Sequence, residues 1–240
     1  MIFDLDSTPP DIGFPETRLA ETDPNGLLAI GGDLSSERLV NAYRRGIFPW
    51  FSKGQPILWW SPAPRMVLFA DEFHLSRSLR KTLRRQPFDV SLNQAFEQTI
   101  SACAAPRDQD GGTWLLPEMI ESYAALHAAG IAHSIEVWHH DELVGGLYGI
   151  ALGHIFFGES MFSRRNDASK IALVLLVELA RRRPFEMIDC QVYTEHLARL
   201  GAREIGRDRF EEILETSVNK KAAPLSPMVR FPIANLENAT

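Results

Sequence analysis

Residues 167–192 read DASKIALVLLVELARRRPFEMIDCQV, and the apolar spacing changes halfway through this stretch. Its first part repeats apolar residues at helical spacing, namely Ile171, Ala172, Leu175, Leu176 and Leu179. This periodicity predicts a long helix from Asp167 to Arg182. The part that follows, Phe185–Val192, is a short apolar run typical of a buried strand.

The segments on both sides of this stretch complete a recognisable order of elements. Upstream, β-rich segments separated by short turns predict an antiparallel meander: Ser134–Trp138, Leu143–Ile150 and His154–Phe157. Downstream, His196–Leu200 and Arg209–Thr216 favour helices. Meander, helix, strand, helix is the order of the C-terminal half of the acetyltransferase-like (GNAT) fold, an α/β architecture. Such an order says little about function by itself.

The chain divides by composition near residue 65. Its beginning is rich in Gly, Pro and Trp and is interrupted by one expected helix, Ser35–Arg45. Longer regular elements follow, and we expect them at Met66–Phe69, Asn93–Cys103 and Pro117–Ala129. We therefore predict a small N-terminal domain at 1–65, a GNAT-like catalytic domain at 66–220 and a C-terminal tail at 221–240.

Composition limits the class of protein. The 240 residues are 45% hydrophobic and 23% charged, which is an ordinary globular balance. Cys103 and Cys190 are too few for a disulfide framework or a cysteine-based zinc site. Asp4 and Asp6 stand where a signal peptide needs positive charge, and no apolar run reaches the length of a membrane span. We expect a cytoplasmic protein.

Positive charge is concentrated in one segment of an otherwise acidic chain, whose net charge is −6. The run RSLRKTLRR places five cations on one face of a predicted helix: Arg77, Arg80, Lys81, Arg84 and Arg85. Basic runs are commonly solvated helix faces. Because no acid is interleaved, phosphate binding is an equally good interpretation.

Polar residues in apolar strands are the candidates for chemistry. Asp189 and Gln191 are two residues apart in FEMIDCQV, so we expect them to project from one face of the strand and Cys190 from the other. Glu159 lies at the end of a strand, and Gly158 beside it suggests a bulge or a close approach of another backbone, so that Glu159 could face the same cleft. Ordinary alternatives are an Asp that caps a loop and an exposed Glu after a hairpin.

Two tryptophans occur in irregular, turn-rich contexts that suit pocket walls, Trp50 in GIFPWF and Trp114 in GGTWLLP. His139 and His140 are adjacent but lack any metal-ligand spacing, so we predict no metal site. The helix expected at Asp167 begins with SRRNDASK in place of the glycine-rich cradle that GNAT enzymes use for coenzyme A. A different acyl donor is implied, and no cofactor is expected.

Nine segments in order resemble the bacterial leucyl/phenylalanyl-tRNA-protein transferase family over roughly residues 14–215. They are GLLAIGGDLS, GIFPWF, WWSPAPR, AHSIEVW, LVGGLYG, FFGESMFS, DASK, IDCQ and HLARLGA. Ala63 stands where the family pattern has Asp, and Arg199 stands where it has Ser. Neither departure lies among the residues expected to carry the chemistry.

The resemblance implies transfer of Leu or Phe, or of Met, from aminoacyl-tRNA to the N-terminal Arg or Lys of acceptor proteins, which creates a degradation signal. By matching motifs, Trp50, Trp114 and Phe156 would line the aminoacyl pocket. Gln191 would hydrogen-bond the attacking amine, Asp189 would orient and polarise Gln191, and Glu159 would hold the cationic acceptor.

The same resemblance assigns Arg77, Arg80, Lys81, Arg84 and Arg85 to tRNA phosphates. We expect a monomer. The alternatives left open are a coenzyme-A-dependent N-acetyltransferase of the GNAT fold, a cell-wall peptide transferase that uses aminoacyl-tRNA, and a non-catalytic tRNA or degradation-signal adaptor.

Overall fold

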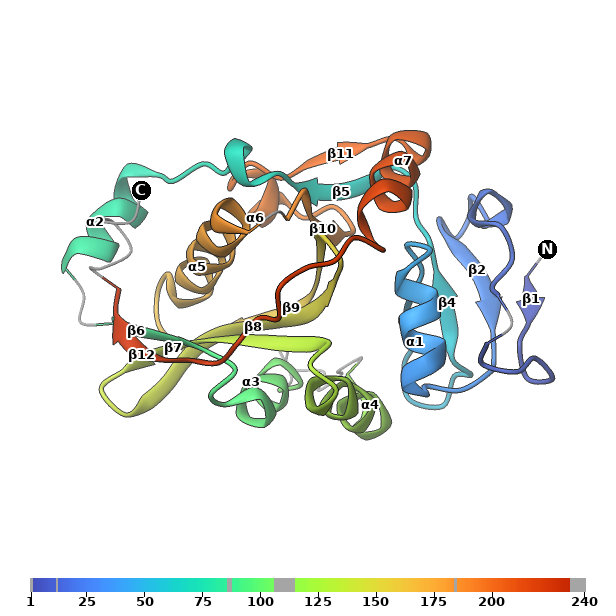
Figure 1. Cartoon of the computed structure of the whole chain (residues 1–240), viewed down its shortest axis with the longest axis horizontal. Coiled ribbons are helices and arrows are strands. Elements are labelled where there is room, and N and C mark those ends of the chain that lie inside the picture. Colours follow the sequence, from blue (N-terminus) through green and yellow to red (C-terminus); the bar gives the residue numbers. More distant parts are fainter. Residues whose placement is uncertain (1, 12, 86–87, 106–114, 184, 234–240) are drawn as a thin grey trace.

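The computed structural model describes residues 2–11, 13–85, 88–105, 115–183 and 185–233 (Figure 1). In chain order, its helices and strands within these ranges are β1 (Phe3–Asp4), β2 (Leu27–Ile30), α1 (Ser36–Tyr43), β3 (Phe48–Pro49), β4 (Leu58–Trp60), β5 (Arg65–Leu68), α2 (Arg77–Arg85), β6 (Phe88–Leu92), α3 (Phe96–Cys103), α4 (Pro117–Ala128), β7 (Ala132–His139), β8 (Glu142–Leu152), β9 (Ile155–Ser163), α5 (Ala168–Arg182), β10 (Met187–Gln191), α6 (Glu195–Ala198), β11 (Arg203–Ile205), α7 (Arg207–Ser217) and β12 (Met228–Pro232). Short 3-10 turns occur at Thr17–Leu19 and Ala70–Glu72.

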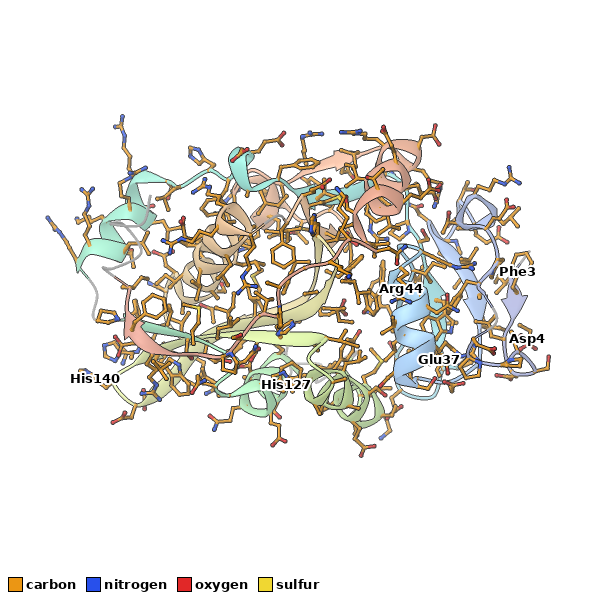
Figure 2. All side chains as sticks on the ribbon, viewed as in Figure 1. Phe3, Asp4, Glu37, Arg44, His127 and His140 are labelled. Atoms are coloured by element: carbon orange, nitrogen blue, oxygen red, sulfur yellow. The ribbon has the colours of Figure 1, made fainter. Side chains whose placement is uncertain are left out.

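The strands of the described residues form two sheets. A four-stranded sheet of order β1-β2-β4-β3 makes up the N-terminal unit, and an eight-stranded sheet has the order β11-β5-β10-β9-β8-β7-β6-β12. Strands β10 and β9 run parallel, and all other neighbouring pairs of the larger sheet, within the described residues, are antiparallel. Phe3 and Asp4 lie at the outer edge of the N-terminal sheet, and His140 lies at the opposite end of the molecule (Figure 2).

Helices cover both faces of the larger sheet. On one face, α3, α4 and α7 pack in a buried cluster that also contains Leu28, Tyr43 and Trp59 of the N-terminal unit. On the other face, α5 packs through Ile171, Leu175 and their neighbours, together with buried leucines of α2. The N-terminal unit therefore shares a continuous apolar core with the larger sheet, and apolar burial is the main favourable term in such packing.

The mixed α/β architecture with a separate N-terminal sheet is confirmed. The meander β7-β8-β9, the long helix α5 and the strand β10 occur in the predicted order. Helix α1 begins after Ser35, whose Oγ accepts a hydrogen bond from the Arg38 backbone N–H at 3.3 Å. The change of sheet falls between Trp60 and Arg65, close to the expected boundary, while the division into domains stays a prediction.

One expectation about regular structure is wrong, and the tail contains an element that was not predicted. The helix expected from Asn93 begins at Phe96, because Asn93 has φ of 58° and its side chain accepts from the Ser134 N–H and donates to the Leu225 carbonyl. The C-terminal tail contains β12, which pairs with β6 and is followed by the buried Ile233. Pairing of this kind uses backbone groups, so composition does not reveal it.

The described helices include none that is both long and apolar enough to cross a membrane. The basic helix α2 lies at the end of the molecule opposite the N-terminal sheet, and β9, β10 and α5 lie between them (Figure 1). A single ligand that contacts both α2 and strands β9 and β10 must therefore be long enough to reach from the end of the molecule to these strands.

Candidate active site

A buried ion pair joins β5 to β10, the second and third strands of the larger sheet. The Arg65 Nε and Nη2 donate to the two carboxylate oxygens of Asp189 at 2.9 and 2.7 Å. The two side chains are 1% and 0% exposed. The Arg65 guanidinium lies 4.8 Å from the ring centres of both Phe48 and Phe210, so it is held between the N-terminal unit and α7.

Asp189 also determines the conformation of the strand end. Its Oδ1 accepts the backbone N–H of Gln191 at 2.8 Å, where the pairing with β5 is interrupted by a bulge and Gln191 has φ of 64°. Left-handed backbone is unfavourable for a residue with a side chain, so this hydrogen bond and the ion pair hold it in place. The bulge turns Gln191 and Cys190 toward one pocket, whereas Asp189 is buried away from it.

This arrangement corrects the expectation from strand alternation. Asp189 and Gln191 do not share a face, and the carboxylate contacts the backbone of Gln191 rather than its side-chain amide. Because both oxygens of Asp189 bind Arg65, this carboxylate is already neutralised by a buried cation. Cys190 lines the pocket, but burial raises the pKa of its thiol, so it stays protonated and is a poor nucleophile.

Glu159 lies opposite Gln191, on the neighbouring strand β9. The expected bulge is confirmed, because the register between β8 and β9 shifts beside Gly158 and leaves Glu159 as the extra residue. Gln191 Nε2 donates to Glu159 Oε1 at 2.8 Å, and the Tyr123 hydroxyl donates to Oε2 at 2.8 Å. The hydroxyls of Tyr123 and Tyr43 are 2.6 Å apart, so hydroxyl groups from α4 and α1 support the carboxylate.

The environment of Glu159 changes its acidity. Burial raises the pKa of Glu159 to about 7, and the negative charge of Asp189 adds to this effect. Hydrogen bonds from Tyr43, Tyr123 and Gln191 act in the opposite direction because they stabilise the ionised form. Burial and the nearby Glu159 raise the pKa of both tyrosines well above the usual range, so they remain donors. A carboxyl group that titrates near neutrality is suited to proton transfer.

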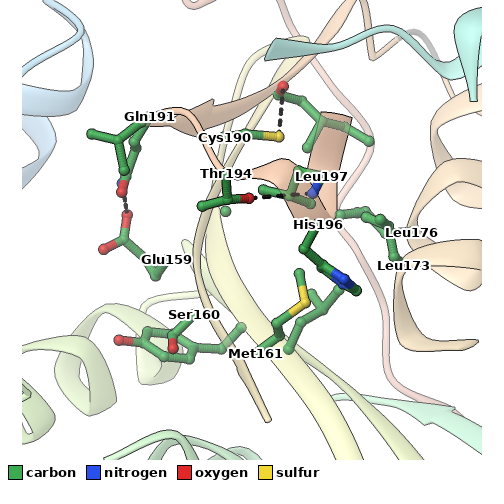
Figure 3. Close-up of a pocket in the computed structure, with 15 residues that line it drawn as sticks. Glu159, Ser160, Met161, Leu173, Leu176, Cys190, Gln191, Thr194, His196 and Leu197 are labelled. Atoms are coloured by element: carbon green, nitrogen blue, oxygen red, sulfur yellow. Dashed lines mark hydrogen bonds between the residues drawn. The ribbon is translucent and has the colours of Figure 1, made fainter. Parts of the chain in front are cut away.

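The Glu159–Gln191 pair stands at one end of an apolar pocket with a volume of about 420 Å³ (Figure 3). Apolar side chains from β8, β9, α5 and β10 form its walls: Leu147, Met161, Leu173, Leu176 and Ile188. Thr194, His196 and Leu197 close it from the side of α6. The combination of apolar walls with a few polar groups at one end is typical of a site for a small apolar group.

The aromatic residues expected in a pocket have different positions. Trp50 is 46% exposed, and its ring lies 5.8 Å from that of Trp60. Phe156 is 1% exposed and packs in the core on the α5 side of β9, outside the lining of the pocket. Trp114 lies outside the described residues. A role for these three side chains in the aminoacyl pocket stays a prediction.

The basic segment is a helix, as predicted, and its cations face solvent. Leu79 and Leu83 attach α2 to the core, and the exposed side chains are Arg77, Arg80, Lys81, Arg84 and Arg85. Sequence reasoning missed the ion-pair partner Arg65 and the two tyrosines Tyr43 and Tyr123. The two tyrosines lie in ordinary helix patterns. Arg65 ends the segment WWSPAPR, but nothing in that segment indicates a partner on a distant strand.

Comparison with known sequences gives one family. Residues 67–215 match the leucyl/phenylalanyl-tRNA protein transferase family, and residues 32–63 match the N-terminal domain of that family. A leucyl/phenylalanyl-tRNA–protein transferase of Cellvibrio japonicus is 57% identical over 207 residues, which are 86% of this chain and 88% of the relative. A relative of the same name from Azotobacter vinelandii is 57% identical over 203 residues, which are 85% of this chain and 90% of the relative.

Likeness to solved structures is distant. A GCN5-related N-acetyltransferase-like protein from Streptococcus suis has a TM-score of 0.34 and 15% identity, over 67% of this chain and 59% of that chain. L-PGS from Bacillus licheniformis has a TM-score of 0.35 and 14% identity, over 78% and 65%. TM-scores this low carry no argument about activity.

The ion pair predicts a specific pattern of stability. Arg65→Met leaves the Asp189 charge buried without a partner, so the free energy of unfolding should fall by about 3–5 kcal/mol. The double variant Arg65→Met/Asp189→Leu should regain most of that loss. Urea unfolding at pH 7 measures the stability of both variants. Arg209→Met is the control, because it removes an exposed ion pair with Glu212 and should cost less than about 1 kcal/mol. A double variant no more stable than Arg65→Met would refute the pairing.

The titration of Glu159 provides a second test. NMR of enzyme labelled with ¹³C in its glutamate carboxyl groups should show one group with a pKa of about 7. Tyr123→Phe removes a hydrogen bond to the ionised form, so the pKa should rise further. Tyr193→Phe changes an exposed tyrosine and should have no effect. The electrostatic description fails if wild-type Glu159 titrates near 4.5, the ordinary value.

Proposed function

This chain belongs to the leucyl/phenylalanyl-tRNA protein transferase family and transfers an aminoacyl group from tRNA to proteins, and we propose that Glu159, Gln191 and the adjoining pocket are its active site. The single observation that carries this proposal is the hydrogen-bonded pair of Glu159 and Gln191 at the end of an apolar pocket. It places polar groups for an amine beside a cavity for an apolar side chain.

The pocket receives the side chain of the donor amino acid. Its volume of about 420 Å³ and its aliphatic walls suit an isobutyl or a benzyl group. Burial of such a group stabilises the complex by about 25 cal/mol for each Å² of apolar surface removed from water. The ester carbonyl of the donor then lies near the polar end, within reach of Gln191.

The reaction is aminolysis of an ester. The acceptor's α-amine attacks the carbonyl, a C–N bond forms, the bond to the tRNA ribose oxygen breaks, and one proton passes overall from the amine to that oxygen. An α-ammonium group has a pKa of about 8, so a carboxylate with a pKa of about 7 can accept its proton before attack. Glu159 takes this role, and it also attracts the cationic end of the acceptor.

Gln191 positions the amine. Its Nε2 is bound to Glu159, and among the described residues its Oε1 accepts no hydrogen bond, so that oxygen is available to an amine N–H. Asp189 acts through position only, because it binds Arg65 and the Gln191 backbone. Placing the amine against the carbonyl removes much of the entropic barrier of a reaction between two molecules.

The remaining parts of the proposal come from the family resemblance. The acceptor begins with Arg or Lys, and its new N-terminus marks it for degradation in the cytoplasm. Exposed cations on α2 contact tRNA phosphates without reading sequence. Trp50, Trp114 and Phe156 contribute to the aminoacyl site, and the enzyme acts as a monomer.

A transfer assay tests donor, acceptor and reaction class together. The enzyme is incubated with radiolabelled leucyl-tRNA and one of two peptides that differ only in Arg or Gly at the first position. Label should enter the Arg peptide alone, and Glu159→Gln should lower the rate at least tenfold, which is about 1.4 kcal/mol of barrier. If no peptide is labelled and acetyl-CoA serves as donor instead, the proposal fails in favour of an acetyltransferase.

Pocket size should determine the choice of donor. Leu173→Ala enlarges the cavity, so the ratio of kcat/KM for phenylalanyl-tRNA to that for leucyl-tRNA should rise about tenfold. Leu175→Ala removes an equally buried leucine of α5 that does not line the pocket, and it controls for loss of stability. Equal ratios in the two variants would contradict the placement of the donor side chain.

A further inference from the structure

A second cavity adjoins the aminoacyl pocket. Its volume is about 450 Å³, and it shares Met161 and His196 with the first pocket as common wall. In Figure 3, His196 extends toward Met161 on the side of the pocket away from Glu159. The two cavities are therefore neighbours that share this wall.

The lining of this cavity differs from that of the first pocket. Ser163, Arg164 and Ser169 provide hydroxyl and guanidinium groups, and no Asp or Glu among the described residues lines it. Burial of the His196 ring and the nearby Lys170 and Arg199 lower the pKa of His196. The histidine is therefore neutral at pH 7, and the positive charge of the cavity comes from Arg164.

Arg164 is held in position by the protein. Its backbone N–H donates to the Val144 carbonyl at 2.7 Å, and its Nη1 donates to the Leu143 carbonyl at 3.1 Å. Its guanidinium also lies 5.4 Å from the centre of the Phe162 ring. Within the described residues, its Nε and Nη2 donate to no protein group. A positioned guanidinium with donors to spare is suited to a phosphate.

The cavity lies on the way from α2 to the active site. Arg165, the next residue, lines a third hollow together with Thr82 of α2, and the Thr82 hydroxyl donates to Asp167 at 3.0 Å. The segment before α5 thus connects the basic helix to the second cavity. Arg164 follows Glu159 by five residues, which at about 3.3 Å per residue is about 16 Å of extended chain. The last few nucleotides of a single strand span such a distance.

We propose that the second cavity binds a backbone phosphate of the unpaired CCA end of the donor tRNA, with Arg164 as the partner of that phosphate. This inference rests on the proposed function, because it assumes that the aminoacyl group occupies the first pocket. Arg164 contributes affinity for the nucleic acid and takes no part in the transfer of the aminoacyl group.

Two stable donor analogues test the proposal by equilibrium binding. Both carry leucine in amide linkage at the 3′ position, one on adenosine, which has no phosphate, and one on the trinucleotide CCA. Arg164→Gln should weaken binding of the trinucleotide about tenfold and change binding of the nucleoside less than twofold. The slope of log K against log salt concentration for the trinucleotide should become shallower by about 0.7, the value for one phosphate contact on a single strand.

Arg165→Gln is the matched control, since it removes the same charge from the same segment, and its Nη1 lies 3.5 Å from His139 Nε2. It should change neither affinity by more than twofold. An unchanged trinucleotide affinity in Arg164→Gln, an equal loss with the nucleoside, or an equal loss in Arg165→Gln would each overturn the proposal. If wild-type enzyme fails to bind the nucleoside analogue, the fault lies with the proposed aminoacyl pocket instead.

Discussion

The buried contact between Arg65 and Asp189 is the interaction on which the site depends. Charges removed from water need a partner with good geometry, and this pair has two short hydrogen bonds in a nearly fully buried position. The arginine is held between Phe48 and Phe210, so segments from the N-terminal unit and from α7 meet at β10. The position of Gln191 at the end of β10 therefore depends on the N-terminal unit and on α7 as well as on the sheet.

The same constraint separates the roles of the acidic residues. Asp189 is bound on both oxygens and determines the backbone of Gln191, whereas Glu159 has no cation beside it among the described residues and burial raises its pKa to about 7. Two carboxyl groups in neighbouring strands thus differ in their electrostatic environment because their partners differ: one binds a cation, and the other binds neutral hydroxyl and amide groups. In the proposed reaction, Glu159 handles the proton and Asp189 maintains geometry.

Prediction from the sequence worked where local pattern and tertiary structure agree. The apolar repeat of α5, the meander and the buried strand β10 follow directly from residue spacing, and Gly158 correctly indicated the bulge at Glu159. The rule that side chains alternate between the two faces of a strand gave the wrong prediction for Asp189 and Gln191, because a bulge between them interrupts the alternation. The partners Arg65, Tyr43 and Tyr123 could not be predicted, since contacts between distant segments leave no trace in local periodicity.

The most direct test of the proposed site is a crystal structure of the enzyme with a stable leucyl-adenosine amide and a peptide that begins with Arg. The leucyl side chain should lie against Leu147, Leu173 and Ile188, with the peptide's terminal nitrogen within hydrogen-bond distance of the Gln191 and Glu159 side chains. A peptide nitrogen bound elsewhere, or an Asp189 released from Arg65 to contact it, would contradict the division of roles between the two carboxyl groups.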